Sequence, residues 1–382
     1  MAKIAIILLD QHHEVLSSHI TSLHAAGHDV TVFTNSFCRG KLRKNELEAI
    51  SECFIREEKK SIDHFLSFYK TEIDRSDAQL VPSIDGNYGE YISPKYFNNP
   101  YLLVHSYHAI IDPFGHISWK KSWKSNLITL LKAAKGVCTR SYHKRVVTAL
   151  QYEHILLPSE SVLRYCNELE HKSNNKQILG LAPFYTHERM NHVYERKVIK
   201  VIVPGTVIYK SRDYQILLDA LLKVDKKIEL EIVLLGKLKE RPKELERLKE
   251  CKNIILRTYD EYLTQEEYDF ELFDADFLIL PLMHEMNFGI VSEKAGYTAL
   301  SGNVNDVTRF AIPALITESI PMPAPIDEIS ERFADAHSLA KLINQWCIKK
   351  TFNELKWARK EESWNRIDAK SQGKLIARSM GL

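Results

Sequence analysis

The chain lacks any run of about 20 apolar residues, the length that a helix needs to cross the apolar core of a bilayer. Its six cysteines are scattered and form neither a CxxC pair nor a metal-binding spacing, which is typical of reduced thiols in a cytoplasm. The net charge of +2 is too small to indicate nucleic acid as a partner, and the sequence shows no internal repeat. These absences favour an ordinary globular protein of the cytoplasm.

The 382 residues are too many for one ordinary core and suit two domains of about 150–200 residues each. The opening MAKIAIILLD runs directly into a helical pattern without a small-residue cleavage site, so we expect a first strand there rather than a signal peptide. Strand and helix patterns alternate in both halves, which predicts parallel sheets wrapped by helices. We place the linker between the domains near residues 183–196.

Two apolar strands of the second half end at glycine. The strand in KVIKVIVPG ends at Gly205 and is followed by Thr206, Lys210 and Arg212, and the strand in EIVLLG ends at Gly236. A glycine lets a ligand approach the backbone, and open α/β sheets bind ligands at the carboxyl ends of their strands. The two cations therefore indicate an anionic ligand. The alternative is a solvated helix start with two surface cations.

A Ser-Gly turn opens a short helix further along, in SGNVNDVTRFAIPALI. A helix that begins at Ser301, Gly302 and Asn303 directs unpaired N–H groups and the positive end of its dipole at an anion. Asp306 lies about one turn below that point, within reach of a ribose diol. The alternatives are an ordinary helix cap and a surface pair between Asp306 and Arg309.

The order of these motifs resembles glycosyltransferases of the GT-B fold, particularly the family-4-type enzymes that use nucleotide-diphospho-sugars. The resemblance covers most of the chain, including the opening KIAIILLDQHHEVLSSHITSLHAAGHDVTVFT and the later FDADFLILP. It implies an α/β fold of two facing, Rossmann-like, doubly wound domains. Residues 1–185 would form the acceptor-side domain, residues 193–350 the donor domain, and residues 351–382 a helical segment that packs back on the first domain.

The resemblance also implies the residues that bind the donor. They are Gly205, Thr206, Lys210, Arg212, Gly236, Glu285, Ser301, Gly302, Asn303 and Asp306. Two alignments of the donor carboxylate stay open. Glu285 and Glu293 have the spacing of the family's two glutamates, whereas an alignment anchored on Pro313 puts Asp306 in the place of the ribose-binding carboxylate, and we prefer the latter.

We expect no essential metal and no required cofactor besides the nucleotide-sugar donor. Metal-free transferases neutralise the leaving diphosphate with Lys, Arg and helix N-termini. The pair Asp274 and Asp276 has the spacing of a metal-binding DxD motif, but it runs into an apolar strand. A zinc site built from the many histidines lacks the necessary cysteine or carboxylate spacing.

Catalytic candidates lie in the first half, in VHSYHAIIDPFGH. A neutral histidine at the mouth of a strand can hydrogen-bond a sugar hydroxyl or act as a base, which makes His105 and His108 candidates. Asp112 is the nearest carboxylate that could serve as the base. His12 and His13 follow the first strand and are further candidates for ligand contact. The alternative for all of them is a core or surface role.

Residues between Pro113 and Tyr152 include eight Lys or Arg and two Trp, but no Asp or Glu. A basic helix with Trp and Leu suits a membrane surface or an anionic acceptor. We therefore expect peripheral membrane contact through residues 117–145, at the inner face of the membrane. A solvated basic face over core Trp and Leu is the alternative.

The sequence thus predicts a cytoplasmic glycosyltransferase that moves a sugar to the hydroxyl of a glycan or lipid-linked acceptor, in the synthesis of a cell-surface polysaccharide or glycoconjugate. The resemblance favours retention of the anomeric configuration. Two alternatives keep the fold. One is an epimerase or phosphorylase-like enzyme, and the other is a protein that binds a nucleotide sugar without turning it over.

Overall fold

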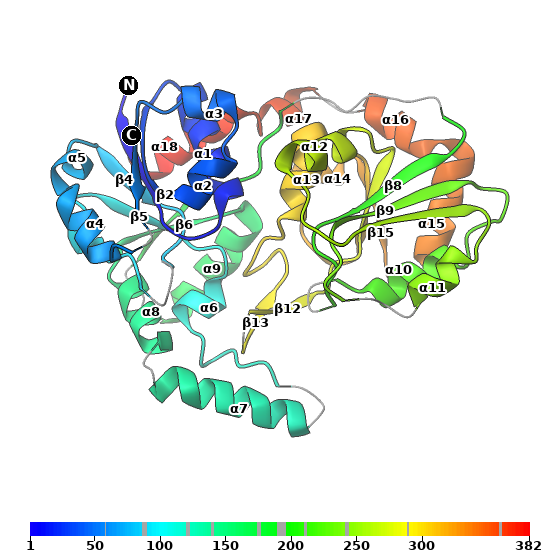
Figure 1. Ribbon diagram of the computed structural model, residues 1–382, viewed down its shortest axis with the longest axis horizontal. Coiled ribbons are helices and arrows are strands. Elements are labelled where there is room, and N and C mark those ends of the chain that lie inside the picture. Colours follow the sequence, from blue (N-terminus) through cyan, green and yellow to red (C-terminus); the bar gives the residue numbers. More distant parts are fainter. Residues whose placement is uncertain are drawn as a thin grey trace. The chain divides into compact units, whose positions relative to one another are not determined.

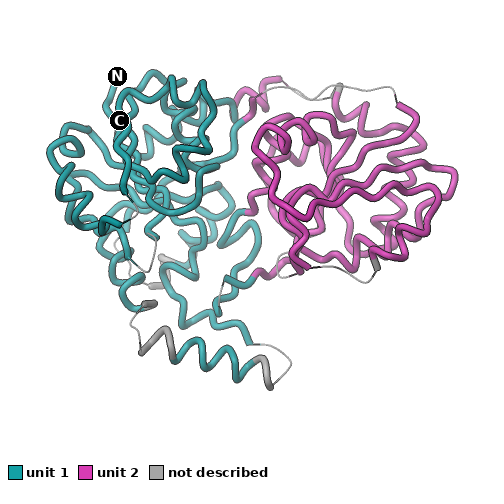
Figure 2. Tube along the Cα trace, in the orientation of Figure 1, with its two compact units in different colours: residues 1–186, 287–300, 367–382 teal, residues 187–286, 301–366 magenta. Residues whose placement is uncertain are grey.

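A computed structural model describes most of the chain (Figure 1). The described residues are 1–57, 59–85, 90–119, 123–138, 141–173, 177–188, 196–209, 212–240, 244–288, 290–358 and 361–382. They divide into two compact units (Figure 2). Unit 1 contains Met1–Thr186, Asn287–Leu300 and Ile367–Leu382, and unit 2 contains His187–Met286 and Ser301–Arg366. Residues 287–300, which the sequence analysis counted with the donor domain, belong to unit 1.

Unit 1 is built on a parallel sheet, which has seven strands in the described part of the chain. The strands are β1 (Lys3–Leu8), β2 (Asp29–Asn35), β3 (Glu52–Arg56), β4 (Ala78–Val81), β5 (Pro100–Leu103), β6 (His154–Leu157) and β7 (Ile178–Leu181). Their order is β3-β2-β1-β4-β5-β6-β7, with parallel pairing throughout. The order reverses between β1 and β4, and such a switch point is where open α/β sheets bind ligands.

Helices cover both faces of this sheet because alternate residues of each strand point to opposite sides. In β1, Ile4 and Ile6 join one core cluster while Ala5 and Ile7 join the other. The helices are α1 (His13–Ala25), α2 (Ser36–Lys41), α3 (Lys44–Glu48), α4 (Ile62–Phe68), α5 (Lys70–Asp74), the 3-10 helix η2 (Pro94–Tyr96), α6 (Tyr107–Ile111), α7 (Trp123–Cys138), α8 (Ser141–Leu150), α9 (Glu160–Ser173) and α18 (Ala369–Ser379).

The last helix, α18, packs against α1 (Figure 1). A β-carbon on Gly373 would lie 1.9 Å from the carbonyl oxygen of Ser22, so the two helix backbones approach as closely as glycine permits. The hydroxyl of Tyr101 on β5 donates to the carbonyl of Met380 at 2.6 Å. The C-terminal helix therefore returns to the first unit, as predicted, whereas residues 351–366, which the sequence analysis placed in the same segment, belong to unit 2.

Unit 2 repeats the architecture with a parallel sheet of six described strands in the order β10-β9-β8-β11-β14-β15. The strands are β8 (Ile199–Pro204), β9 (Leu230–Lys237), β10 (Ile254–Tyr259), β11 (Phe277–Leu280), β14 (Ala314–Thr317) and β15 (Ser330–Phe333). The helices are α10 (Tyr214–Leu221), α11 (Glu244–Lys249), α12 (Gln265–Phe273), α13 (Asn303–Phe310), α14 (Ala324–Asp327), α15 (Ala336–Lys349), α16 (Thr351–Ala358) and α17 (Glu361–Asn365). Here the strand order reverses between β8 and β11.

Two doubly wound parallel-sheet units confirm the α/β fold class expected from the sequence. A separate two-stranded sheet contains β12 (Glu285–Phe288) and β13 (Val291–Lys294). Within unit 1, this segment is joined to the rest by isolated bridges between Ile117 and Val291 and between Ser106 and Ala299. No helix in the described ranges is both long and apolar enough to cross a bilayer.

Candidate functional site

The carboxyl ends of β8 and β9 meet at two glycines of unit 2. Gly205 has a φ of +89° and Gly236 a φ of +155°, conformations that residues with a side chain rarely adopt. A β-carbon on Gly236 would lie 2.5 Å from the carbonyl carbon of Gly205, and one on Gly205 would lie 2.2 Å from Nη2 of Arg212. Gly236 therefore requires glycine because the backbone of Gly205 occupies the space of a side chain, and Gly205 favours glycine because of its positive φ.

Arg212 joins this strand edge to the helix that follows the Ser-Gly turn. Its Nη1 donates to the carbonyl of Thr206 at 3.1 Å, and its Nη2 donates to Oδ1 of Asn303 at 3.0 Å. Nδ2 of Asn303 in turn donates to the carbonyl of Pro204 at 3.1 Å and to Oδ2 of Asp306 at 2.9 Å. The first turn of α13 is thus fixed to the end of β8, with the guanidinium beside it.

The Ser-Gly turn leads into α13 as the sequence pattern predicts. The backbone N–H of Asn303 donates to Oγ of Ser301 at 3.3 Å, and Gly302 is the exposed residue that precedes the helix. The helix ends at Ala311 in the left-handed conformation, with a φ of +50°, before Pro313 leads into β14. Turn, helix and strand therefore follow one another in the expected order.

Asp306 hydrogen-bonds Asn303 and does not form the surface pair with Arg309 that was an alternative from the sequence. Burial raises the pKa of its carboxyl to about 6, although the hydrogen bond from Asn303 and the positive charges of Arg309 and Arg212 act in the opposite direction. Arg309 instead forms ion pairs with Glu188 at 3.0 Å and with Asp269 on α12. The carboxyl of Asp306 therefore remains directed toward Asn303.

Tyr268 on α12 is a member of this group that the sequence analysis missed. Its hydroxyl hydrogen-bonds Asp306, and burial raises its pKa well above the usual value, so it stays a protonated donor. A single aromatic residue on a helix is an ordinary core pattern, so the sequence held no signal for this role.

Two of the expected donor residues are not part of this description of the group. Lys210 lies outside the described residues, so its place is not assigned. Glu285 lies on β12 with an exposed side chain, and the hydrogen bonds described for Arg212, Asn303 and Asp306 do not include it. The structure thus brings together Gly205, Thr206, Arg212, Gly236, Ser301, Gly302, Asn303 and Asp306 at one edge of the sheet.

Glu293, the second member of the glutamate pair, is fully buried in unit 1. Its carboxylate accepts the backbone N–H of Ala109 at 2.7 Å and that of His108 at 3.4 Å, so it caps the N-terminus of α6. Burial raises the pKa of this carboxyl to about 7, despite the hydrogen bonds from Thr298 and the two backbone groups. The contacts of Glu293 account for it as a structural residue of unit 1.

His108 is buried between this carboxylate and a second imidazole. Its Nδ1 lies 3.1 Å from the carbonyl oxygen of Ser292, and its ring stacks on that of His116 with the centroids 3.4 Å apart. Burial lowers the pKa of His108 to about 4, so the ring is neutral near pH 7. Its Nε2 is buried and has no hydrogen-bond partner among the described residues.

Asp112 ends α6 and is mostly exposed. Its Oδ1 accepts the backbone N–H of Gly115 at 3.0 Å, and its Oδ2 lies 3.8 Å from Nε2 of His116. The third catalytic candidate, His105, follows β5, where its Nε2 lies 2.7 Å from the carbonyl oxygen of Pro82. Burial, reinforced by the neighbouring His12, lowers the pKa of His105 to about 3.

A carboxylate that the sequence analysis did not consider stands beside His105 at the switch point of the unit 1 sheet. Asp10 follows β1 and is buried, and its Oδ1 accepts the backbone N–H of His12 at 3.0 Å. Nε2 of His12 lies 3.5 Å from Oδ2 of Asp10, and the rings of His12 and His105 are 5.7 Å apart. Burial raises the pKa of Asp10, while His12 and a hydrogen bond from Ser83 oppose the change. The motif LLDQHH directly after a strand was the available signal.

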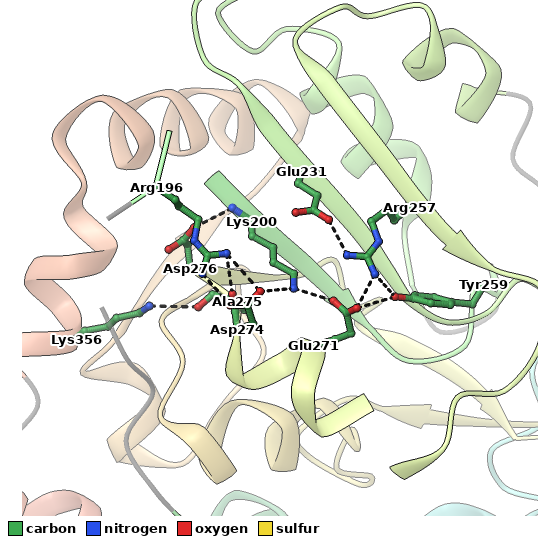
Figure 3. Close-up of polar contacts among 10 residues, drawn as sticks. All are labelled: Arg196, Lys200, Glu231, Arg257, Tyr259, Glu271, Asp274, Ala275, Asp276 and Lys356. Carbon is green, nitrogen blue, oxygen red and sulfur yellow. Dashed lines mark hydrogen bonds and ion pairs between the residues drawn. The ribbon is translucent and has the colours of Figure 1, made fainter. Parts of the chain in front are cut away.

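A larger network of charges lies at the opposite, amino-terminal edge of the unit 2 sheet (Figure 3). The buried ammonium of Lys200 lies between Asp274, at 2.7 Å, and Glu271, at 2.8 Å. Arg257 bridges Glu231 and Glu271 at 2.7 and 2.6 Å. Carboxylates therefore pair the buried ammonium of Lys200, as a buried charge requires, and they also pair the partly exposed guanidinium of Arg257.

Asp274 and Asp276, the pair with DxD spacing, also accept hydrogen bonds within this network. Arg196 donates to Asp274 at 2.8 Å, the backbone N–H of Lys200 donates to Asp276 at 2.8 Å, and Lys356 donates to the carbonyl of Ala275 between them at 3.2 Å (Figure 3). Within the described residues, no three His, Cys, Asp or Glu side chains form a group that could hold a metal ion.

No model of a protein family matches the chain, and no curated protein matches it in sequence. Solved structures match it over its full length. HepE of Anabaena, in complex with UDP and glucose, is similar with a TM-score of 0.55 at 10% identity, covering 100% of both chains. TarM gives 0.56 at 10% identity, covering 100% of this chain and 99% of its own. The lipopolysaccharide outer core galactosyltransferase WaaB, in its apo form, gives 0.54 at 11% identity over 99% of each chain.

These three neighbours are GT-B glycosyltransferases. At about 10% identity the likeness establishes the fold, which is the GT-B fold that the sequence motifs predicted. The chain therefore has the GT-B fold. The described polar residues at the carboxyl edges of its sheets include Arg212, Asn303 and Asp306 in unit 2 and Asp10, His12 and His105 in unit 1.

Proposed function

We propose that the protein is a glycosyltransferase that moves a sugar from a nucleotide-diphospho-sugar to an acceptor hydroxyl. The observation that carries this proposal is the Arg212–Asn303–Asp306 group at the carboxyl edge of the unit 2 sheet, beside Gly205 and Gly236. The fold neighbour HepE has been crystallised with UDP and with UDP-glucose, which supports a uridine nucleotide as the first donor to test.

Unit 2 would hold the donor. The guanidinium of Arg212 and the first N–H groups of α13 are suited to the charge of a diphosphate, which grows as the bond to the sugar breaks. Lys210, two residues before Arg212, would add a second cation. The carboxylate of Asp306 would accept hydrogen bonds from the ribose hydroxyls. In this arrangement Lys, Arg and helix N–H groups neutralise the leaving group, so the proposed reaction needs no metal.

Unit 1 would hold the acceptor. His105 is neutral at physiological pH and can hydrogen-bond a hydroxyl, and His12, which stands beside a buried carboxylate, can receive the proton of a hydroxyl. The buried His108 on α6 and the exposed Asp112 at the end of α6 would contribute to the same acceptor site. We further propose a glycan or lipid-linked acceptor in the synthesis of a cell-surface polysaccharide. The resemblance to family-4-type enzymes supports retention of the anomeric configuration.

The first experiment is a thermal-shift series of the purified protein with UDP, GDP, ADP, CMP, dTDP and their sugar conjugates. The proposal expects a concentration-dependent rise in melting temperature with one diphosphate, because a ligand that binds the native state stabilises it. No shift with any of them would overturn the donor site. Binding without release of the diphosphate in the presence of acceptors would indicate a non-catalytic nucleotide-sugar binder, and turnover without acceptor would indicate an epimerase.

The acceptor side has its own test. His12→Gln should lower the rate of sugar transfer by about 10²–10⁴-fold, the range for a lost proton acceptor, while the dissociation constant of the donor stays unchanged. His24→Gln on the exposed side of α1 is the matched control and should retain full activity. Equal rates for the two variants would remove His12 from the mechanism.

A further inference from the structure

Helix α7 has a well-defined inner side. It lies at the margin of unit 1, next to α6 and α8 (Figure 1). Thr129 and Ala133, one turn apart, are buried, and Ala133 packs in one cluster with Ala109 of α6 and with Ile290 and Val291 of the β13 segment. These are the elements that carry His108 and Glu293. The inner side of α7 therefore packs on the elements that carry His108 and Glu293.

The opposite side of α7 exposes aliphatic side chains. Successive residues of a helix are about 100° apart, so Leu127 and Leu131 lie opposite the buried Thr129 and Ala133. The exposed fractions are 47% for Leu127, 53% for Ile128, 49% for Leu130 and 62% for Leu131. We call these four residues the outer face of α7. Single exposed aliphatic residues are common, but a contiguous apolar face on one helix indicates a surface that a partner covers.

The charges in the sequence that contains α7 identify the kind of partner. The sequence from 113 to 152 has no Asp or Glu and contains Lys120, Lys121, Lys124, Lys132, Lys135, Arg140, Lys144 and Arg145. Lys132 of α7 and Lys144 of α8 are exposed in the structure. A second copy of this chain would bring two such basic segments together, and facing like charges disfavour association. An anionic partner is favoured instead.

An aromatic residue just before the helix fits the same partner. The indole of Trp119 is 59% exposed. Trp side chains concentrate at the interface between the hydrocarbon and the headgroups of a bilayer, where their apolar body and polar N–H are both satisfied. Apolar residues, basic residues and Trp together are the composition of a helix that lies in the plane of a lipid surface.

We propose that the outer face of α7 docks on an anionic lipid bilayer and inserts into its headgroup region. The docking places α6 and the β13 segment, which hold the inner side of α7, next to the lipid. As a deepening of the proposed function, on which this second step rests, the acceptor is then a lipid-linked molecule whose hydroxyl is presented at the bilayer surface. The docking itself does not depend on the proposed donor site.

The test is sedimentation of the full-length protein with vesicles. We expect the wild type to sediment with vesicles of phosphatidylcholine and phosphatidylglycerol, to stay in solution with phosphatidylcholine alone, and to bind less as salt is added. Leu127→Ser/Leu131→Ser should weaken binding to the anionic vesicles by about tenfold or more, because it removes inserted methylene and methyl groups. Ile255→Ser/Ile348→Ser is the matched control, since both side chains are exposed in unit 2.

The docking would be overturned if the wild type did not sediment with anionic vesicles, or if the two double variants bound these vesicles equally. It would also be overturned if light scattering showed a dimer that the Leu127→Ser/Leu131→Ser variant abolishes. The last would identify a second copy as the occupant. Thermal shifts with nucleotides separate this proposal from the proposed function. A protein that binds vesicles but no nucleotide keeps the docking and loses the transferase. A protein that binds nucleotide but no vesicle keeps the proposed transferase and loses the docking.

Discussion

Nη2 of Arg212 lies 3.0 Å from Oδ1 of Asn303, and this hydrogen bond joins the segment after β8 to the first residue of α13, 91 positions later in the chain. Because Asn303 also donates to the carbonyl of Pro204 and to Asp306, a single amide fixes a cation, a strand end and a carboxylate in one group. The group thus contains a cation, Arg212, and a carboxylate, Asp306, with the N-terminus of α13 between them. A ligand with both a diphosphate and a diol would need a cation for the first and a hydrogen-bond acceptor for the second.

Arg212→Ala and Lys210→Ala should each weaken the binding of a nucleoside diphosphate by roughly 1–3 kcal/mol, the range for charge-assisted hydrogen bonds. Isothermal titration calorimetry measures the change directly. Arg247→Ala on α11 is the control, because its side chain is exposed away from the strand edge. Wild-type affinity in both site variants would mean that the diphosphate binds elsewhere.

The affinity for UDP-glucose should rise as the pH increases from 5 to 7. Burial raises the pKa of Asp306 to about 6, and the ionised carboxylate is the form that accepts hydrogen bonds from both ribose hydroxyls. The diphosphate of UDP-glucose carries no proton that titrates in this range, so the protein sets the profile. Asp306→Asn should weaken binding at pH 7.5 by about 1–3 kcal/mol and flatten the profile. Parallel profiles for variant and wild type would exclude Asp306 from the site.

Gly236→Ala should lower the free energy of unfolding of unit 2 by about 2 kcal/mol or more, since the alanine is both strained in φ and pressed against Gly205. Gly302→Ala is the matched control, because no atom lies within 4 Å of a β-carbon there, and it should cost less than about 1 kcal/mol. Differential scanning calorimetry compares the two. Similar losses would show that the close approach of β8 and β9 is not what requires glycine.

The stability of unit 1 should fall as the pH rises through the titration of Glu293. In the unfolded chain this carboxyl ionises near its ordinary value of 4.5, and in the folded chain at about 7, because burial disfavours the charge. Between these values the native state holds one more proton than the unfolded state. The wild type should therefore lose about 2–3 kcal/mol more than Glu293→Gln between pH 5 and pH 8 in chemical denaturation.

Glu285→Gln on β12 provides the comparison for that experiment, because its side chain is exposed and caps no helix. This variant should follow the wild type at every pH. If Glu293→Gln also followed the wild type, the buried carboxyl would not be the group that titrates.

The sequence could predict that the residues around Arg212 and Asn303 lie together, because each part follows a local rule. Strands that end at glycine, a cation shortly afterwards and a Ser-Gly helix start all lie at the carboxyl edge of a parallel sheet, so Gly205, Arg212 and Ser301 had to be neighbours. The preference for Asp306 over the glutamate pair came from the same logic of turn, helix and strand. Its role in binding stays a prediction.

The parts that the sequence did not predict depend on packing between segments far apart in the chain. Glu293 lies in a short segment with no strong periodicity, and no local pattern says that it packs on α6 in unit 1. Tyr268 joins Asp306 through the packing of α12 against α13, which leaves no trace in spacing. Asp10 was visible as a carboxylate after a strand, but its burial beside His12 depends on the neighbouring strands.

The chain passes between the two units four times, after Thr186, Met286, Leu300 and Arg366. During synthesis, the first 186 residues emerge without the segment that caps α6 and without the helix that covers α1. Unit 1 therefore cannot reach its final packing until residues 367–382 have left the ribosome, although it begins first. Unit 2, whose pieces lie between these segments, has all of its strands available earlier, so the half of the molecule that is made second is the first that can complete its fold.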